Sequence, residues 1–197
     1  MNIGIDIDDV ITDGEAYYAY AQKYIVEKLK REPIIVNDLG LCESASYCDE
    51  LFGWTQEEAD DFWGKNMENV LTSVQPRLFA KEAISKLREE GHKIIIITAR
   101  QKKEMEIGLA WLKKYNIEYD DLYFEIEEKG KKAKEKNIDI FIDDSYRNCR
   151  NVSEQGINTY IMDIRTNRNI DLKNTRIKRV FSWPHFYEEI RKREELR

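Results

Sequence analysis

Two pairs of acidic residues follow apolar runs that are typical of buried strands. Asp6 and Asp8 come at the end of the first run, and Asp143 and Asp144 come at the end of a later one. Residues two apart on a strand point to the same face of a sheet, so Asp6 and Asp8 are expected to face one crevice. Acidic residues also form turns after strands, so a lone Asp-Ile-Asp is a weak signal.

The second pair of acids indicates metal binding. In open parallel sheets, ligands bind beyond the carboxyl ends of the strands. If the two strands are neighbours, up to four carboxylates converge there, and like charges raise each other's pKa values unless a counter-charge is present. A hard divalent cation supplies that charge, and Mg²⁺ prefers oxygen ligands. The sequence therefore predicts a magnesium site at these strand ends.

A candidate anion site follows a third apolar run. Thr98, Ala99 and Arg100 come directly after four consecutive isoleucines and ahead of a helical pattern. A hydroxyl group and free backbone N–H groups at the start of a helix can bind a phosphate. The alternative role for Thr98 is that of an ordinary helix N-cap.

A lysine is the remaining candidate among the site residues. Lys129 precedes Gly130 at the start of a short and highly charged helical pattern. A single lysine in such a run is normally a surface residue, and Lys131 and Lys132 are alternatives. The Lys-Gly step favours Lys129.

Short apolar runs alternate with longer amphipathic segments along the chain. The runs are rich in isoleucine and show no polar alternation, which is typical of a parallel sheet covered by helices on both faces. This rhythm predicts an α/β fold with right-handed crossovers and a five-stranded parallel sheet. The expected strands are 3–7, 93–98, 122–126, 140–143 and 158–162. One expected helix is opened by Pro76 and closed by Gly91. Further helical patterns lie at 105–112, 129–136 and 148–155.

The connection between the first two strands is far too long for a simple crossover. We interpret residues 15–75 as a helical cap inserted after strand one, with a catalytic core formed by 1–14 and 76–197. Helices are expected within the cap at 17–29, 44–52 and 55–67. The cap is rich in aromatic residues, most of which should form its core. Phe62 and Trp63 are candidates for substrate contact.

Composition limits the class of protein. The 197 residues fit one domain that carries a small insertion. Hydrophobic residues make up 42% of the chain, which excludes a disordered or collagen-like protein. Charged residues make up 36%, but the net charge is only −6. This balance argues against a protein that coats a nucleic acid polymer or a membrane surface.

The expected location is the cytoplasm. The sequence has no apolar stretch of about 20 residues that could span a membrane. It begins with neither the basic nor the apolar region of a signal peptide. Its three cysteines have no zinc-like spacing and are expected to be free thiols in a reducing compartment.

Taken together and in order, these motifs resemble those of haloacid dehalogenase (HAD) superfamily phosphatases. The resemblance spans essentially the whole chain, and the insertion falls where that superfamily places a helical cap. The four motifs are Asp6-Ile7-Asp8-Asp9-Val10, 94–98, Lys129, and Ile142-Asp143-Asp144-Ser145. Residues 91–100 and Ser182-Trp183 are similar to the 5′(3′)-deoxyribonucleotidase group and its bacterial relatives. The resemblance implies a HAD-like Rossmannoid fold, which is a three-layer sandwich.

The resemblance also implies roles for the acids. Asp6 would be the nucleophile that attacks phosphorus and forms an aspartyl-phosphate. Asp8 would protonate the leaving alkoxide and then activate the hydrolytic water. The side chains of Asp6 and Asp143 and the backbone carbonyl of Asp8 would hold Mg²⁺. Asp144 would act in an outer shell or through water.

The implied substrate is a small phosphorylated metabolite, with a nucleoside monophosphate as the expected class. Thr98 and Lys129 would hold the phosphoryl oxygens and offset charge in the transition state. A sugar phosphate or another small phosphate is the alternative. The sequence departs from the nucleotidases at Asp9, where they usually carry Gly. It also lacks their Gly-aromatic-aromatic stretch, since 67–71 reads Met-Glu-Asn-Val-Leu.

Two other classes fit less well. A receiver-type signalling module also combines acids, a threonine and a lysine, but its acid pair comes first and its lysine last. Such modules also lack a helical insertion of about sixty residues. A non-catalytic binding protein fits poorly because every reactive position of the motifs is filled.

Overall fold

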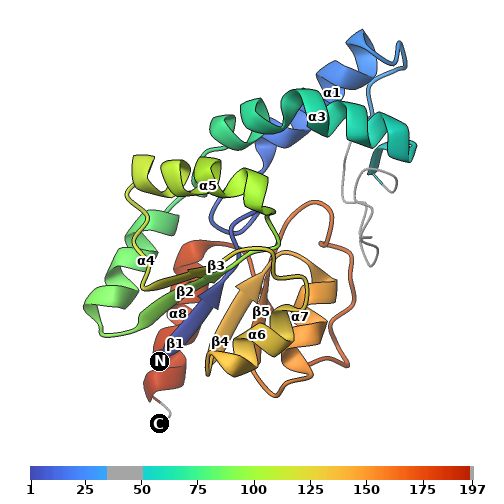
Figure 1. The fold of residues 1–197 in the computed structure, drawn as a ribbon. Coiled ribbons are helices and arrows are strands. Elements are labelled where there is room, and N and C mark those ends of the chain that lie inside the picture. The colour runs from blue at the N-terminus through green and yellow to red at the C-terminus, as the bar shows by residue number, and fades with distance from the viewer. Residues whose placement is uncertain (35–50, 196–197) are drawn as a thin grey trace.

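The sheet is parallel throughout and has six strands. The computed structural model describes residues 1–34 and 51–195. The strand order is β3-β2-β1-β4-β5-β6, and each neighbouring pair is parallel (Figure 1). The strands are β1 Asn2–Ile5, β2 Lys93–Ile97, β3 Asp121–Tyr123, β4 Ile140–Asp143, β5 Asn158–Met162 and β6 Ile177–Val180. The predicted parallel α/β sheet is confirmed, with one strand more than the expected five.

The extra strand, β6, lies at the edge of the sheet. Only Ile177 and Val180 of its four residues are buried. A strand this short and half polar lacks the continuous apolar run that identified the other strands. Its place is set by parallel pairing with β5, from Thr159–Ile177 to Met162–Val180.

The first strand is shorter than expected. β1 ends at Ile5, so Asp8 lies on the turn that follows and not on a strand. Asp9, on the same turn, has a positive φ of 54°. The alternation rule for strands therefore does not place Asp8, and its orientation is decided by the turn and its neighbours.

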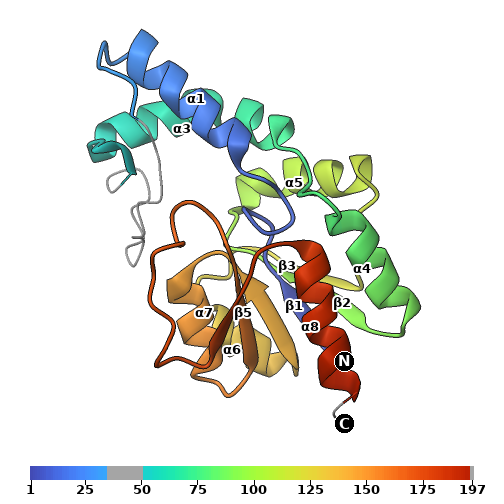
Figure 2. The ribbon, with the colours of Figure 1, turned by 180° about the vertical axis from the view of Figure 1, so that it is seen from behind.

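Helices cover both faces of the sheet and give the expected three layers. α4 Ala80–Glu89, α5 Lys102–Lys114 and α8 Trp183–Glu195 lie on one face (Figure 2). α6 Lys129–Glu135 and α7 Tyr146–Ser153 lie on the other. The larger apolar core lies under the first group and includes Ile5, Ile96, Trp111, Trp183 and Phe186.

The helix that was expected to open at Pro76 starts later than predicted. α4 begins at Ala80 and not at Pro76, which instead forms an isolated antiparallel bridge with Thr12. Phe79 precedes the helix in the left-handed conformation, with φ of 65°. The bridge thus holds Pro76 against the loop after β1, and α4 starts only after this contact.

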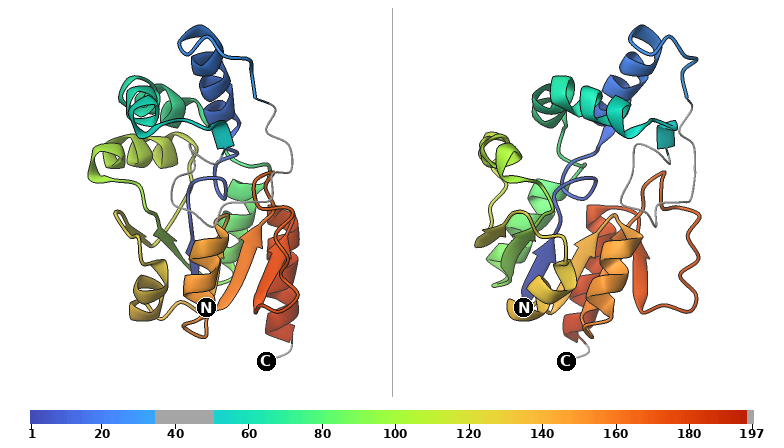
Figure 3. Two further views of the ribbon diagram at one scale, coloured as in Figure 1. Left: turned by 90° about the vertical axis from the view of Figure 1, so that its right-hand side faces the viewer. Right: turned by 45° about the vertical axis from the view of Figure 1, so that its right-hand side comes forward.

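Two helices lie beyond the carboxyl ends of the strands. They are α1 Glu15–Glu27 and α3 Gln56–Ser73, and they pack side by side (Figure 3). They share an apolar cluster separate from the sheet's core, formed largely by aromatic residues: Tyr17, Tyr18, Tyr24, Phe52, Trp54 and Phe62. The helix expected at 44–52 falls almost entirely outside the described residues. No helix within 1–34 or 51–195 has the length and apolar character needed to cross a membrane.

Candidate active site

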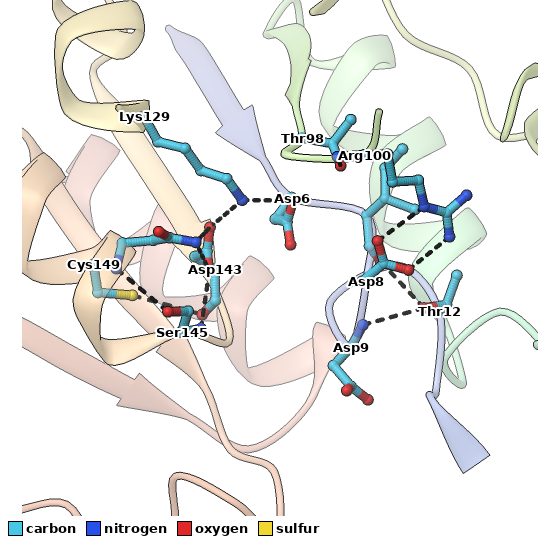
Figure 4. A network of polar contacts seen from close by, with 12 residues as sticks. Asp6, Asp8, Asp9, Thr12, Thr98, Arg100, Lys129, Asp143, Ser145 and Cys149 are labelled. Atoms are coloured by element: carbon cyan, nitrogen blue, oxygen red, sulfur yellow. Dashed lines mark hydrogen bonds and ion pairs between the residues drawn. The ribbon is translucent and has the colours of Figure 1, made fainter. Parts of the chain in front are cut away.

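Three adjacent strands bring the predicted residues to one edge of the sheet. β1 lies between β2 and β4, so Asp6 follows the central strand while Thr98 and Asp143 mark the ends of its two neighbours (Figure 4). The backbone N–H of Asp6 donates to the carbonyl of Ile142 at 3.1 Å, which ties the first acid to β4. The strand order therefore brings the predicted site residues together. The sequence predicted this only on the condition that the strands are neighbours.

Lys129 is the counter-charge inside this cluster. Its Nζ lies 2.7 Å from Asp6 Oδ1 and 2.7 Å from Asp143 Oδ2, and its side chain is 1% exposed. Burial disfavours the charged ammonium, but the two carboxylates outweigh it and raise the pKa of Lys129. Lys131 is exposed, and Lys132 pairs with Glu135. Of these three lysines, only Lys129 reaches the acids.

The Lys-Gly step has a packing cause. A Cβ at Gly130 would lie 2.3 Å from the backbone oxygen of Asn151 on α7. The backbone N–H of Gly130 also donates to Asn151 Oδ1 at 2.6 Å. Glycine therefore lets the start of α6 approach α7, which places Lys129 under the strand ends.

The acids remain short of positive charge despite Lys129. Carboxylate oxygens of Asp6, Asp143 and Asp144 lie within 4.8 Å of one another. Burial, with Asp143 and Asp8 nearby, raises the pKa of Asp6 to about 7 against the effect of Lys129. Burial and the neighbouring acids also raise the pKa of Asp144 well above its usual value. Crowded oxygen donors with raised pKa values fit a hard divalent cation.

Asp8 is held by an arginine. Arg100 Nε donates to Asp8 Oδ2 at 2.9 Å, and Arg100 Nη2 donates to Asp8 Oδ1 at 2.6 Å. The arginine side chain is 3% exposed and the aspartate 49%. Burial alone would raise the pKa of Asp8, but the guanidinium outweighs it and lowers that pKa. The predicted anion contact of Arg100 is thus occupied by a carboxylate of the protein.

Thr98 is buried and is not a helix N-cap. α5 begins only at Lys102, and Gln101 is its N-cap. Thr98 Oγ1 instead accepts a hydrogen bond from the N–H of Arg100 at 3.2 Å, and Ala99 is exposed between them. Thr98 therefore stands at the end of β2, where Figure 4 shows it close to Asp6.

The loop after β1 is held by two residues that sequence reasoning missed. Arg77 Nε donates to the carbonyl of Asp9 at 2.9 Å, and Trp183 Nε1 donates to the carbonyl of Val10 at 2.9 Å. The positive φ of Asp9 explains why glycine suits this position in related proteins. Burial raises the pKa of the Asp9 carboxyl to about 7. For Trp183, the family resemblance at Ser182-Trp183 was a signal in the sequence. For Arg77 there was none.

The two candidate cap residues have different environments. Phe62 is fully buried in the aromatic cluster, so its ring is not available to stack on a base. Trp63 is partly buried and stacks on Tyr17, with the ring centroids 5.3 Å apart and the planes 4° apart. The structure thus gives Phe62 a packing role.

One of the two helices beyond the sheet, α1, contacts the loop that follows β5. Arg165 forms an ion pair with Glu15 on α1, and its guanidinium lies 4.8 Å from the ring centroid of Tyr18. Asn167 in the same loop donates to the backbone oxygen of Asp144 at 2.8 Å. One loop therefore connects α1 to the acidic cluster.

The fold is that of HAD-like proteins. A haloacid dehalogenase-like hydrolase from Streptococcus pneumoniae superposes with a TM-score of 0.72 at 13% identity, covering 98% of this chain and 97% of that one. A predicted phosphatase from Clostridium acetobutylicum gives a TM-score of 0.73 at 13% identity, covering 97% and 98%.

The family model of the 5′ nucleotidase, deoxy (Pyrimidine), cytosolic type C proteins matches residues 1–195, and the chain belongs to this family. A nucleotidase of Clostridium acetobutylicum is 28% identical over 194 residues, which cover 95% of this chain and 92% of the relative. Family and fold together make the protein a phosphoric monoester hydrolase.

Proposed function

We propose that the protein is a Mg²⁺-dependent nucleotidase that hydrolyses nucleoside monophosphates through an aspartyl-phosphate on Asp6. The observation that carries the proposal is the buried triad in which Lys129 Nζ contacts both Asp6 and Asp143 at 2.7 Å. A carboxylate beside a fixed cation at the carboxyl edge of a parallel sheet suits attack on an anionic phosphate.

The reaction has two displacements at phosphorus. In the first, an Asp6 carboxylate oxygen attacks, the P–O bond to the nucleoside breaks, and the leaving oxygen takes a proton from Asp8. Arg100 lowers the pKa of Asp8 in the free protein, so Asp8 would take up this proton when the negative charge of the phosphate lies beside it. In the second, water attacks the phosphorus of the aspartyl-phosphate and gives its proton to Asp8. The P–O bond to Asp6 then breaks, which releases inorganic phosphate and restores both acids.

Charge in the pocket is offset by residues of the chain and by the proposed cation. Lys129 and the Thr98 hydroxyl would contact the phosphoryl oxygens. The side chains of Asp6 and Asp143 and the backbone carbonyl of Asp8 would hold Mg²⁺, with Asp144 bound through water. The cation would neutralise these carboxylates and polarise the phosphoryl group.

Residues 15–75 are proposed as the cap that covers this pocket. The support is the position of α1 and α3 beyond the strand ends (Figure 1), the aromatic cluster that they share and the contact of Arg165 with α1. A cap that excludes water protects an acyl-phosphate intermediate from uncontrolled hydrolysis. The nucleotide preference is supported by the family description and by the name of the Clostridium relative.

The test is a phosphate-release assay over matched substrates. The panel holds ribo- and deoxyribonucleoside 5′- and 3′-monophosphates, sugar phosphates and amino-acid phosphates, each with Mg²⁺. Asp6→Asn protein prepared in parallel measures contaminating phosphatase. Turnover of a nucleoside monophosphate above the other classes supports the proposal. Turnover confined to sugar phosphates would overturn the nucleotide preference and leave the phosphatase chemistry standing.

A further inference from the structure

Arg100 follows the predicted phosphate-binding residue Thr98, yet its guanidinium donates from Nε and Nη2 to the carboxylate of Asp8. We propose that Arg100 is a positioning residue that orients the Asp8 carboxylate toward the leaving group, and that it does not bind the phosphate. This inference rests on the proposed function, because it concerns how the same site delivers a proton.

The two side chains differ sharply in accessibility. Asp8 is 49% exposed while Arg100 is 3% exposed, so a substrate can reach the aspartate but not the guanidinium behind it. Two parallel N–H donors fix the carboxylate plane, which one donor would leave free to rotate. Each carboxylate oxygen keeps a second lone-pair direction, so the open edge of Asp8 can still meet a leaving oxygen.

Arg100 is itself fixed by its surroundings. Its N–H donates to Thr98 Oγ1 at 3.2 Å, and its carbonyl accepts from the N–H of Glu125 at 3.0 Å. On α5, a Cβ at Gly108 would lie 3.3 Å from Arg100 Nη1 and 3.5 Å from the ring of Phe124. A methyl group at position 108 would therefore press closely on the guanidinium, which lies directly against α5.

This arrangement has a cost at Nη1, the third nitrogen of the guanidinium. Among the described residues, Arg100 Nη1 is buried and has no hydrogen-bond partner. A buried unpaired donor is costly, and such exceptions in a folded protein require an explanation. Here Nε and Nη2 are aimed at Asp8, which leaves Nη1 beside Gly108.

The chemical consequence depends on the leaving group. When the P–O bond breaks, its electron pair moves to the leaving oxygen, which takes a proton from Asp8. A p-nitrophenolate leaves readily without that proton, whereas a phenolate or a nucleoside alkoxide depends on it more strongly. A misplaced Asp8 therefore harms poor leaving groups selectively, while a lost phosphate contact harms all substrates alike.

The test compares phenyl phosphate with p-nitrophenyl phosphate in Arg100→Met, using kcat/KM because it reports the steps up to breakage of the ester bond. We expect a loss of about 10-fold or more for phenyl phosphate and less than about 3-fold for p-nitrophenyl phosphate, within the usual range of general acid catalysis. Inhibition by inorganic phosphate should not change. Adding Arg100→Met to Asp8→Asn should cost less than about 2-fold more, because the arginine acts through the aspartate.

Two further variants keep the test decisive. Arg77→Met loosens the same loop at Asp9 without touching the Asp8 side chain, and it should change both substrates by the same factor. Gly108→Ala favours the helix, so α5 stays folded. Its methyl group presses on Arg100 and should give a smaller defect with the same leaving-group dependence. This variant carries the test if Arg100→Met fails to fold.

Three results would overturn the inference. They are equal losses for both esters together with weaker phosphate inhibition, a full further loss in the Asp8→Asn background, or the same selective defect in Arg77→Met. A wild-type protein that releases phosphate neither from these esters nor from any nucleoside monophosphate of the panel would instead overturn the proposed function, so the two failures are distinguishable.

Discussion

Replacing Lys129 with methionine tests the buried counter-charge most directly. Methionine has a side chain of similar length, but it lacks the ammonium group that lies 2.7 Å from both Asp6 and Asp143. The two carboxylates then face each other without a counter-charge. Removing one partner of a buried ion pair costs about 3–5 kcal/mol because the other charge stays buried and uncompensated. We expect a loss of this size in the free energy of unfolding at pH 8 without metal.

The loss should depend on pH with a defined sign. Even with Lys129 present, the pKa of Asp6 is raised to about 7 from its unpaired value of 3.8. A carboxyl whose pKa is raised by folding favours the folded state at low pH, and this advantage is lost as the pH rises through the folded value. Without the lysine the raised pKa moves higher still. The deficit of Lys129→Met should therefore be smaller at pH 5 than at pH 8.

Urea unfolding at both pH values, with EDTA present, measures the deficit. Lys131→Met is the matched control on the same helix, since Lys131 is exposed, and it should change stability by less than about 0.5 kcal/mol. Activity of Lys129→Met should fall by about 100-fold or more, as for loss of one preorganised charge donor. A deficit below about 1 kcal/mol at pH 8, or one equal at the two pH values, would refute this account of the cluster.

Three further predictions concern Asp6 and the metal. Asp6→Asn should keep its circular dichroism spectrum and lose at least about 10³-fold in p-nitrophenyl phosphate hydrolysis, or about 4 kcal/mol of barrier. Near wild-type turnover would exclude Asp6 as the nucleophile. EDTA should abolish turnover and Mg²⁺ should restore it, whereas full activity in metal-free buffer would contradict the clustered-acid argument. Because the pKa of Asp6 is raised to about 7, Mg²⁺ must displace protons at pH 6. Calorimetry should therefore show tighter Mg²⁺ binding at pH 8 than at pH 6, and pH-independent affinity would be evidence against this ligand set.

The sequence by itself determined the elements that carry strong local signals. Apolar runs identified five of the strands, and the signal was strongest for β1, β2 and β4, because a strand buried on both faces has few polar positions. The insertion was visible as a connection too long for a crossover. The order of Asp6, Thr98, Lys129 and Asp143 along the chain resembles that of HAD-superfamily phosphatases, and this resemblance indicated phosphatase chemistry.

The local signals failed where a neighbour in space sets the structure. β6 forms because it pairs with β5 at the sheet edge, although its own sequence is half polar. α4 starts four residues late because Pro76 is held against Thr12. Periodicity describes one segment at a time, so it cannot register such constraints.

Only the tertiary structure decided which side chains meet. The close approach of α6 to α7 places Lys129, and not Lys131, beside the acids. Phe62 is buried because it packs in the aromatic cluster between α1 and α3. The pairing of Arg100 with Asp8 joins residues 92 positions apart in sequence. Residue types determine what chemistry is available, but distances of about 3 Å between charges depend on strand order and helix packing, which act across the whole chain.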